Sequence, residues 1–322
     1  MSITRRRMLV AVASGPLLSA LARGQGFPSK PIRLVVPFPP GGGTDVVSRT
    51  LAERLAPLLR TAVVVENRPG AGGNLGLDLA AKAPPDGYTI AMGQTSNLAI
   101  NPTLYSSLPF SPLKDFAPIA LVAAQPLVLV VARDALWTTL ADIVTASKAK
   151  PLTMASAGNG TVGHLAGEMF ARRAGIAFVH VPYKGAAPAL TDLVGGQVAV
   201  FFASAGAVMG QLDGGRVRAI AVTSARRMGR LPNVPTIAES GYAGFEATDW
   251  KGLVAPAGTA VNIVKDLNAA VLRALAAPEV TERLAAEGSE PIGGSPETFA
   301  RFIRDEGVKW SEIVKQTGAK VD

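Results

Sequence analysis

A run of three glycines, Gly41–Gly43, is the part of the sequence whose residue types most clearly suggest a binding function. It follows the apolar segment 32–36, whose β-branched residues are typical of a buried strand. It precedes the segment 44–59, in which leucines and valines recur every three or four positions, as on one face of a helix. A helix that starts after such a turn leaves its first backbone N–H groups without partners, and glycines let a ligand approach them. The sequence therefore predicts an anion-binding turn.

Glycine turns can also bind nucleotides, and each nucleotide-binding motif requires particular residues beside its glycines. The Gly41–Gly43 turn lacks the Gly-Lys-Ser/Thr of a phosphate-binding loop. The turn at 158–163 (GNGTVG) matches G-x-G-x-x-G, but the strand end about 20 residues later carries Lys184 instead of the acid that binds a ribose. A lysine there could contact a 2′-phosphate. An exported NADP-dependent oxidoreductase that uses this turn is therefore an alternative function.

The composition argues against most kinds of catalytic or metal centre. The chain has no cysteine and only two histidines, which excludes a thiol nucleophile and a cysteine-ligated metal and disfavours a histidine-rich one. No Gly-x-Ser-x-Gly nucleophile motif occurs. Aromatic residues are 6% and are not interleaved with basic ones, so a nucleic-acid surface is not indicated. We predict no enzyme activity, no catalytic residue, no metal and no cofactor.

The first 22 residues have the pattern of an export signal. Arg5–Arg7 precede an apolar stretch too short to span a membrane, and Ala20, Leu21 and Ala22 form a small-residue cleavage pattern. The paired arginines resemble the twin-arginine signal. We expect residues 1–22 to be removed and the protein to be periplasmic.

The rest of the chain alternates strands and helices, which favours an α/β fold with parallel or mixed sheets flanked by helices. With 322 residues, of which 48% are hydrophobic, the chain has enough material for about two domains. Proline-bounded strands suggest that the second domain is inserted in the first. We predict lobe 1 at 27–122 and 225–322, and lobe 2 at 123–224.

Five stretches together resemble one family. They are VPFPPGGGTDVVSR, VENRPGAGGNLG, MASAGNGTVGHLAGEMF, HVPYKGAAPALTDLVGGQV and LPNVPTIAESG, and they occur in the family's order along the chain. The chain resembles the Bug family, the extracytoplasmic receptors of tripartite tricarboxylate transporters. Ala199 stands where that family usually has an acid, so its ligand preference is not carried over.

The resemblance implies a two-lobed periplasmic-binding-protein fold of type II-like architecture, with a hinge between the lobes. It implies a monomer that captures a small carboxylate and delivers it to the large and small membrane subunits of a transporter. No nucleic acid is expected as a partner. The predicted ligand-binding residues come from the glycine turns and from the ends of neighbouring strands: Pro40, Gly41, Gly42, Gly43, Thr44, Asp45, Thr95, Ser156, Gly158, Asn159, Gly160, Thr161, His164, Tyr183, Lys184 and Asp192. Within this set, Asp45 is expected to fix its own loop, and Asp192 to accept from an amino or hydroxyl substituent.

Overall fold

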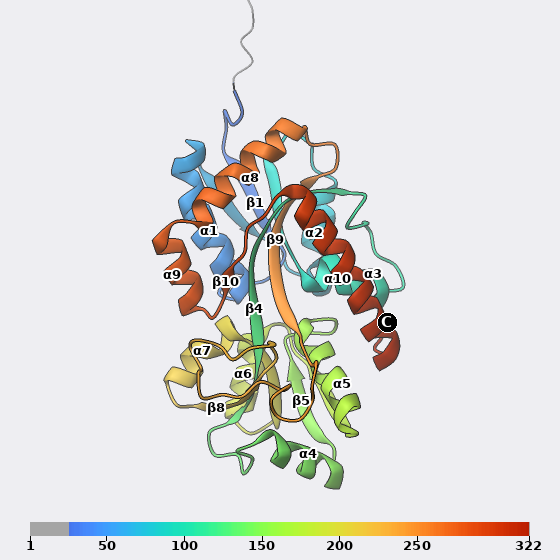
Figure 1. Cartoon of the computed structure of the whole chain (residues 1–322). Coiled ribbons are helices and arrows are strands. Elements are labelled where there is room, and N and C mark those ends of the chain that lie inside the picture. The colour runs from blue at the N-terminus through green and yellow to red at the C-terminus, as the bar shows by residue number, and fades with distance from the viewer. Residues whose placement is uncertain (1–25, 322) are drawn as a thin grey trace, which may run out of the picture.

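The computed structural model describes residues 26–321, so the predicted export signal at 1–22 lies outside the described residues. The strands form two groups, drawn as the upper and lower parts of Figure 1, which we call lobe 1 and lobe 2. Lobe 1 contains β1 (Ile32–Val36), β2 (Val63–Asn67), β3 (Thr89–Gln94), β9 (Thr248–Pro256), β10 (Glu290–Pro291) and the first part of β4 (Phe116–Ala132). Lobe 2 contains the rest of β4 with β5 (Leu152–Ser156), β6 (Phe178–Pro182), β7 (Val200–Ser204) and β8 (Val217–Val222).

Both lobes are mixed sheets built around a parallel set. In lobe 1, β1 pairs in parallel with β2 and β3, and β9 then pairs antiparallel to β3. In lobe 2, β5 pairs in parallel with β6 and β7, and β4 pairs antiparallel to β7 and β8. This confirms the predicted α/β class with parallel and mixed sheets.

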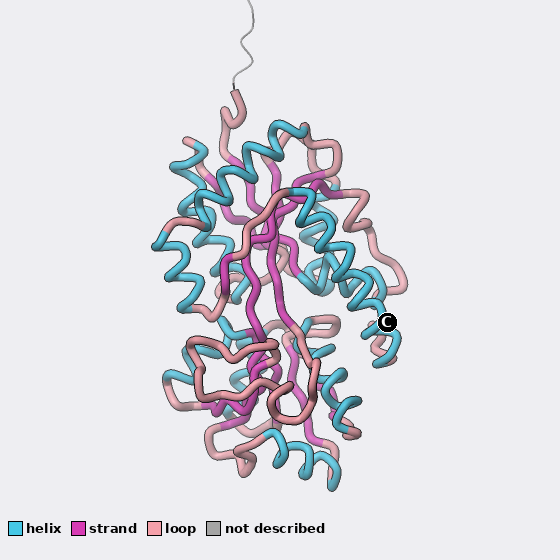
Figure 2. The backbone as a smooth tube through the Cα atoms, viewed as in Figure 1, coloured by secondary structure: helices cyan, strands magenta, loops and turns pink. Residues whose placement is uncertain are grey.

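Two segments of the chain connect the lobes. The first is the long strand β4, and the second is the return of the chain from β8 into β9. From Phe116 to Pro126, β4 pairs with β9, and from Leu127 onward it pairs with β7 and β8. Figure 2 shows β4 and β9 running side by side between the lobes. At the second crossing, the buried Thr223 hydroxyl accepts from Leu127 N (2.8 Å) and contacts Ala247 O. The lobe boundaries predicted from the sequence stay a prediction.

Helices cover both faces of each sheet because neighbouring strand residues point to opposite faces. On lobe 1, one face packs against α1 (Gly43–Leu59), α8 (Val261–Leu275) and α9 (Pro278–Ala286). Its other face packs against α2 (Asn74–Ala81) and α10 (Pro296–Thr317), beside the short helices η1 (Ala71–Gly73), η2 (Ser96–Ile100) and α3 (Asn101–Leu104). On lobe 2, α4 (Leu140–Ala149) and α5 (Val162–Ala174) cover one face, while α6 (Ala186–Val194) and α7 (Ala205–Asp213) cover the other.

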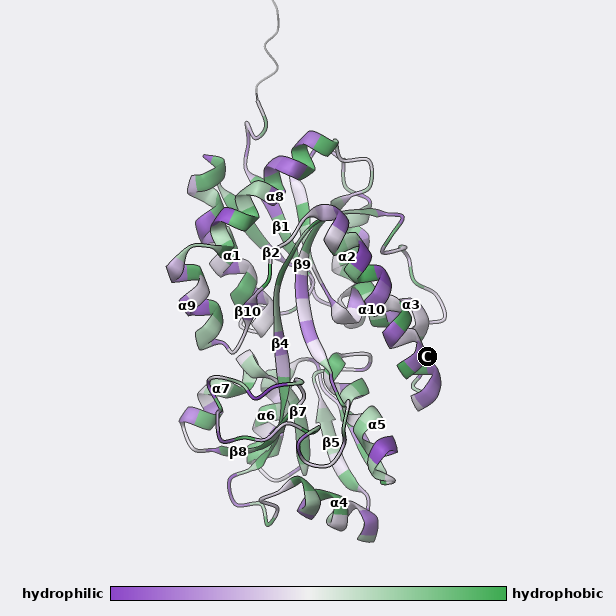
Figure 3. Ribbon diagram, in the orientation of Figure 1, coloured by the Kyte–Doolittle hydropathy of each residue, from purple (hydrophilic) through white to green (hydrophobic). Residues whose placement is uncertain are grey.

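The hydropathy pattern agrees with this layering. In Figure 3 the strands inside each lobe are largely green and the purple residues lie mostly on the outer sides of helices. A purple band on β9, between the lobes, is the exception. Among residues 26–321, no helix is long and apolar enough to cross a lipid bilayer.

The chain's two histidines stack on each other inside lobe 2. The rings of His164 in α5 and His180 in β6 are 3.9 Å apart between centroids, with planes 8° apart. His164 Nδ1 accepts from Gly160 N (3.2 Å), and His180 Nε2 lies 2.7 Å from Ser156 Oγ. Burial, together with the neighbouring His180, lowers the pKa of His164 to about 3, and burial also lowers the pKa of His180.

We predict that this pair makes the protein less stable in acid. Because the pKa of folded His164 lies below 6.5, its ordinary value, the unfolded chain binds more protons between pH 6.5 and 3. Its contribution to the unfolding free energy should therefore fall by about 2 kcal/mol between pH 7 and pH 5. Urea denaturation of wild type and of His164→Gln at both pH values checks this. The variant should lose correspondingly less stability, and an equal loss in both proteins would contradict the prediction.

Candidate functional site

A cleft of about 630 Å³ lies between the two lobes. Lobe 1 contributes the turn from Phe38 to Thr44. Lobe 2 contributes the start of α5, the segment Lys184–Pro188, and Ser204 with the first turn of α7. Gln94, Gln125 and Asp249 line the cleft where the strands cross between the lobes, and we call these three residues the hinge floor.

Three of the helices that begin at this cleft have no side-chain cap. They are α1, α6 and α7, whose N-cap residues are Gly42, Gly185 and Ser204. The first backbone N–H groups of such a helix have no partner within it, and the helix dipole adds positive potential at the same place. Helix starts from both lobes therefore offer backbone donors to one cleft, which is an arrangement suited to binding an anion.

The glycine turn of lobe 1 is held in place from behind. Gly41 has φ +81°, and its N–H donates to Asp45 Oδ2 (3.0 Å). Arg49 Nε and Asn67 Nδ2 also donate to the Asp45 carboxylate, at 2.9 and 2.8 Å. Burial alone raises the pKa of Asp45, but these hydrogen bonds and the Arg49 charge outweigh it and lower the pKa. Asp45 therefore fixes the turn.

Side chains would meet different surroundings at the next two glycines. A Cβ on Gly42, where φ is −84°, would meet only Pro39 O, at 3.8 Å. A Cβ on Gly43 would lie 3.3 Å from Gln125 Nε2, in the hinge floor. Gly42 can thus carry a side chain without disturbing the fold, whereas Gly43 is crowded.

The hinge floor is a network of polar groups. Gln94 Oε1 accepts from Thr44 Oγ1 (2.5 Å), and Gln94 Nε2 donates to Ser96 Oγ (3.0 Å). Gln125 Oε1 accepts from Ser289 Oγ (3.0 Å), and Gln125 Nε2 donates to Asp249 Oδ2 (3.4 Å). The network ties the cleft to the strands that connect the lobes.

The charged side chains that line the cleft are Lys184, Arg216 and Asp249. The two cations are exposed, whereas Asp249 is buried and paired with Lys251. The net field at the mouth of the cleft is therefore positive, which favours an anionic ligand.

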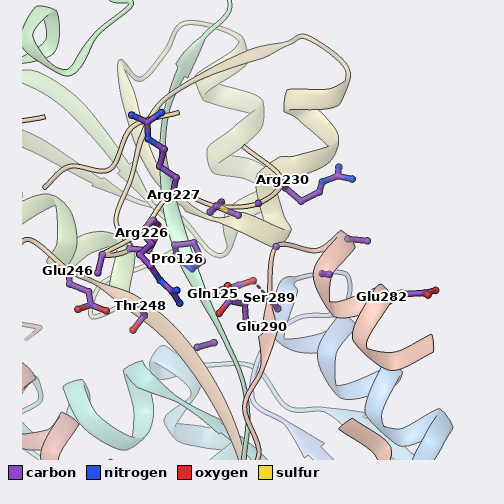
Figure 4. Close-up of a pocket in the computed structure, with 18 residues that line it drawn as sticks. Gln125, Pro126, Arg226, Arg227, Arg230, Glu246, Thr248, Glu282, Ser289 and Glu290 are labelled. Atoms are coloured by element: carbon purple, nitrogen blue, oxygen red, sulfur yellow. Dashed lines mark hydrogen bonds between the residues drawn. The ribbon is translucent and has the colours of Figure 1, made fainter. Parts of the chain in front are cut away.

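A second hollow, of about 830 Å³, lies between the loop Ser224–Arg230, which follows β8, and the α9–β10 region of lobe 1 (Figure 4). Gln125 lines both hollows, and Figure 4 shows its hydrogen bond to Ser289. Acidic and basic side chains both line this hollow. Two of its arginines are already paired, Arg227 with Glu239 and Arg230 with Asp213. It offers less to an anion than the cleft does.

The structure places seven of the sequence-predicted site residues in the cleft lining: Pro40, Gly41, Gly42, Gly43, Thr44, Thr161 and Lys184. The other nine are not among the lining residues: Asp45, Thr95, Ser156, Gly158, Asn159, Gly160, His164, Tyr183 and Asp192. The role of all sixteen in ligand binding stays a prediction.

Several of these nine already have hydrogen-bond partners in the protein. The fully buried Thr95 hydroxyl accepts from Trp250 N (2.8 Å) beside the hinge floor. Tyr183 Oη donates to Asp192 Oδ2 (2.6 Å). Thr161, although in the lining, caps α5 by accepting from His164 N (3.4 Å).

The GNGTVG turn packs against protein atoms. A Cβ on Gly160 would lie 2.4 Å from Leu104 Cδ2 of lobe 1, and one on Gly163 would lie 2.4 Å from Phe202 O. These close approaches explain the glycines without a nucleotide and give no support to the oxidoreductase alternative.

Sequence reasoning missed the hinge floor and the start of α7. Signals for the hinge floor were present, since Gln125 is the one polar residue in the apolar strand β4, and Asp249 lies at the charged start of β9, before its apolar part. The start of α7 gave a weaker signal, because its first residues are small and uncharged.

Comparison with known proteins identifies the family. Residues 47–319 match the model of the tripartite tricarboxylate transporter family receptor. Protein BugT of Bordetella pertussis is 40% identical over 307 residues, which cover 94% of each chain.

Two solved structures are similar throughout. Rpa4515 of R. palustris, solved with adipate, has a TM-score of 0.88 and 36% identity, and the match covers 92% of this chain and 100% of that one. MatC of Rhodopseudomonas palustris, solved with bound malate, has a TM-score of 0.84 and 33% identity over 89% of this chain and 100% of that one. The chain therefore belongs to the tripartite tricarboxylate transporter receptor family, the Bug-type periplasmic binding proteins, which are substrate-binding receptors and not enzymes.

Proposed function

We propose that this protein is a periplasmic receptor that captures a small carboxylate in the inter-lobe cleft and delivers it to the large and small membrane subunits of a transporter. One observation carries the proposal. Three helix N-termini without side-chain caps, from both lobes, line a single cleft whose exposed charges are cationic.

A carboxylate matches these donors in size and charge. A hydrogen bond to a charged group contributes about 1.5–3 kcal/mol, and a helix N-terminus adds up to about 2 kcal/mol. Because α1 belongs to lobe 1 and α6 and α7 to lobe 2, a ligand that contacts both sides binds the closed arrangement better. Binding is thereby coupled to closure, which is the change that a membrane partner can recognise.

The similar structures support the ligand class. Rpa4515 and MatC are described with adipate and with malate, which are both small dicarboxylates. A molecule with two acidic ends suits a cleft that has helix N-termini on both walls. The monomeric state is part of the same proposal.

We predict that Gly42→Val abolishes ligand binding and leaves the fold intact. Gly42 lines the cleft at the start of α1, and a side chain there meets almost no protein atom, so valine would occupy ligand space. Thermal melting with adipate or malate should stabilise wild type according to RT ln(1 + [L]/Kd) and should leave the variant unshifted. Without ligand, the variant should lose no more than about 1 kcal/mol of stability.

Gly229→Val is the matched control. A Cβ on Gly229 would also meet no protein atom within 4 Å, and Gly229 does not have a positive φ. It differs from Gly42 because it lines the second hollow and not the cleft. This variant should keep the full ligand shift. A Gly42→Val protein that binds carboxylates normally would contradict the proposed site, and a wild type that no small carboxylate stabilises would contradict the proposed function.

We further propose that residues 1–22 direct export by the twin-arginine route, on the basis of the paired arginines. Changing Arg5 and Arg6 together to Lys should leave the precursor in the cytoplasm, as measured by cell fractionation. Arg7→Lys, at the motif's variable position, should be exported normally. Unchanged export of the double variant would contradict this route, and a cytoplasmic wild type would contradict the periplasmic location.

A further inference from the structure

A buried ion pair lies in the hinge floor, where β9 passes between the lobes. Asp249 and Lys251 are two positions apart on β9, so their side chains point to the same face of the strand. Lys251 Nζ lies 2.9 Å from Asp249 Oδ2, and the lysine side chain is only 1% exposed. Asp249 is among the residues that line the cleft and Lys251 is not, so the aspartate is the partner that borders the ligand space.

The Asp249 carboxylate has one satisfied oxygen and one unsatisfied oxygen. Oδ2 accepts from Lys251 Nζ and from Gln125 Nε2 (3.4 Å). Asp249 is only 8% exposed, and its Oδ1 is buried without a hydrogen-bond partner. A buried acceptor without a donor is rare and destabilising in native proteins. A donor from outside the protein would remove that cost.

The other side-chain polar atoms of the hinge floor each have at least one hydrogen-bond partner. Gln94 uses its oxygen for Thr44 and its nitrogen for Ser96. Gln125 uses its oxygen for Ser289 and its nitrogen for Asp249. Among Gln94, Gln125 and Asp249, the side-chain atom without any partner is Asp249 Oδ1, an acceptor that matches a hydroxyl or ammonium donor.

We propose that Asp249 Oδ1 accepts a hydrogen bond from a hydroxyl or amino group of the ligand. The substrate class is then a carboxylate that carries such a donor, namely a hydroxy acid or an amino acid, in preference to an unsubstituted diacid. This inference rests on the proposed function, because it assumes that the ligand binds in the inter-lobe cleft. Lys251 neutralises the charge of the carboxylate through its contact with Oδ2. A ligand with an uncharged hydroxyl group is therefore accepted as well as a ligand with an ammonium group.

The test uses three ligands with the same four-carbon diacid skeleton. Succinate has no substituent, malate adds a hydroxyl group and aspartate adds an amino group. Titration calorimetry on wild type should show that malate, aspartate or both bind about 10- to 100-fold more tightly than succinate, the value expected for one hydrogen bond to a charged group.

A paired substitution tests the role of Asp249 itself. Asp249→Leu combined with Lys251→Met removes both charges together, so that no buried ammonium is left alone. The preference for the substituted ligand should fall to within about 3-fold, while succinate binds at least as well as to wild type. Asp86→Asn combined with Lys30→Met removes an exposed ion pair and is the matched control, which should keep the wild-type preference. If the first pair does not fold, Asp249→Val with Lys251→Gln also removes the acceptor and both charges, and it should show the same loss of preference.

The outcomes separate this inference from the proposed function. Wild type that binds succinate as tightly as malate and aspartate would overturn the inference but not the receptor function. A preference that persists in the Asp249 variant would also overturn it. If wild type binds none of the three and no other small carboxylate, the proposed function fails and the inference fails with it.

Discussion

The structure depends on backbone N–H groups that the protein leaves without partners. Some helix starts are closed by side chains, as Thr139 does for α4, Thr161 for α5 and Ser295 for α10, whereas those of α2, α8 and α9 are not. At the cleft, α1, α6 and α7 begin at Gly42, Gly185 and Ser204 without such a cap. Donors without an acceptor in the protein cost free energy, which the proposed carboxylate ligand would recover on binding. Small residues at the helix starts allow the ligand to come close.

This arrangement works only if the two lobes can change their separation while each stays rigid. The layered cores give each lobe its rigidity, because every sheet is covered by helices on both faces. Within residues 26–321 the chain passes between the lobes along β4 and along the crossing that leads into β9, and α5 of lobe 2 also contacts α10 of lobe 1. The polar network of the hinge floor lies at this connection. In the proposed function, residues that border the ligand therefore also contact the strands that connect the lobes, which would couple ligand identity to closure.

Much of the fold could be predicted from the sequence. The apolar run 32–36 is typical of a strand and the segments 260–276 and 296–315 are typical of helices, and the structure has β1, α8 and α10 at those places. The helix α9 escaped prediction because its nine residues give only a short pattern. Gly41–Gly43 and Lys184, which line the cleft, could be named from the sequence because glycine turns and strand ends are visible in it. Asp249 and Gln125 were not named, because long-range strand pairing brings them to the cleft and a linear pattern does not contain that pairing.

The measurement that tests the central claim most directly is a crystal structure with a bound small carboxylate such as malate. We predict that its carboxylate oxygens lie 2.7–3.2 Å from backbone nitrogen atoms at the start of α1 and at the start of α6 or α7. A ligand held instead by the side chains of Lys184 and Arg216, with those backbone N–H groups still open to water, would contradict the account.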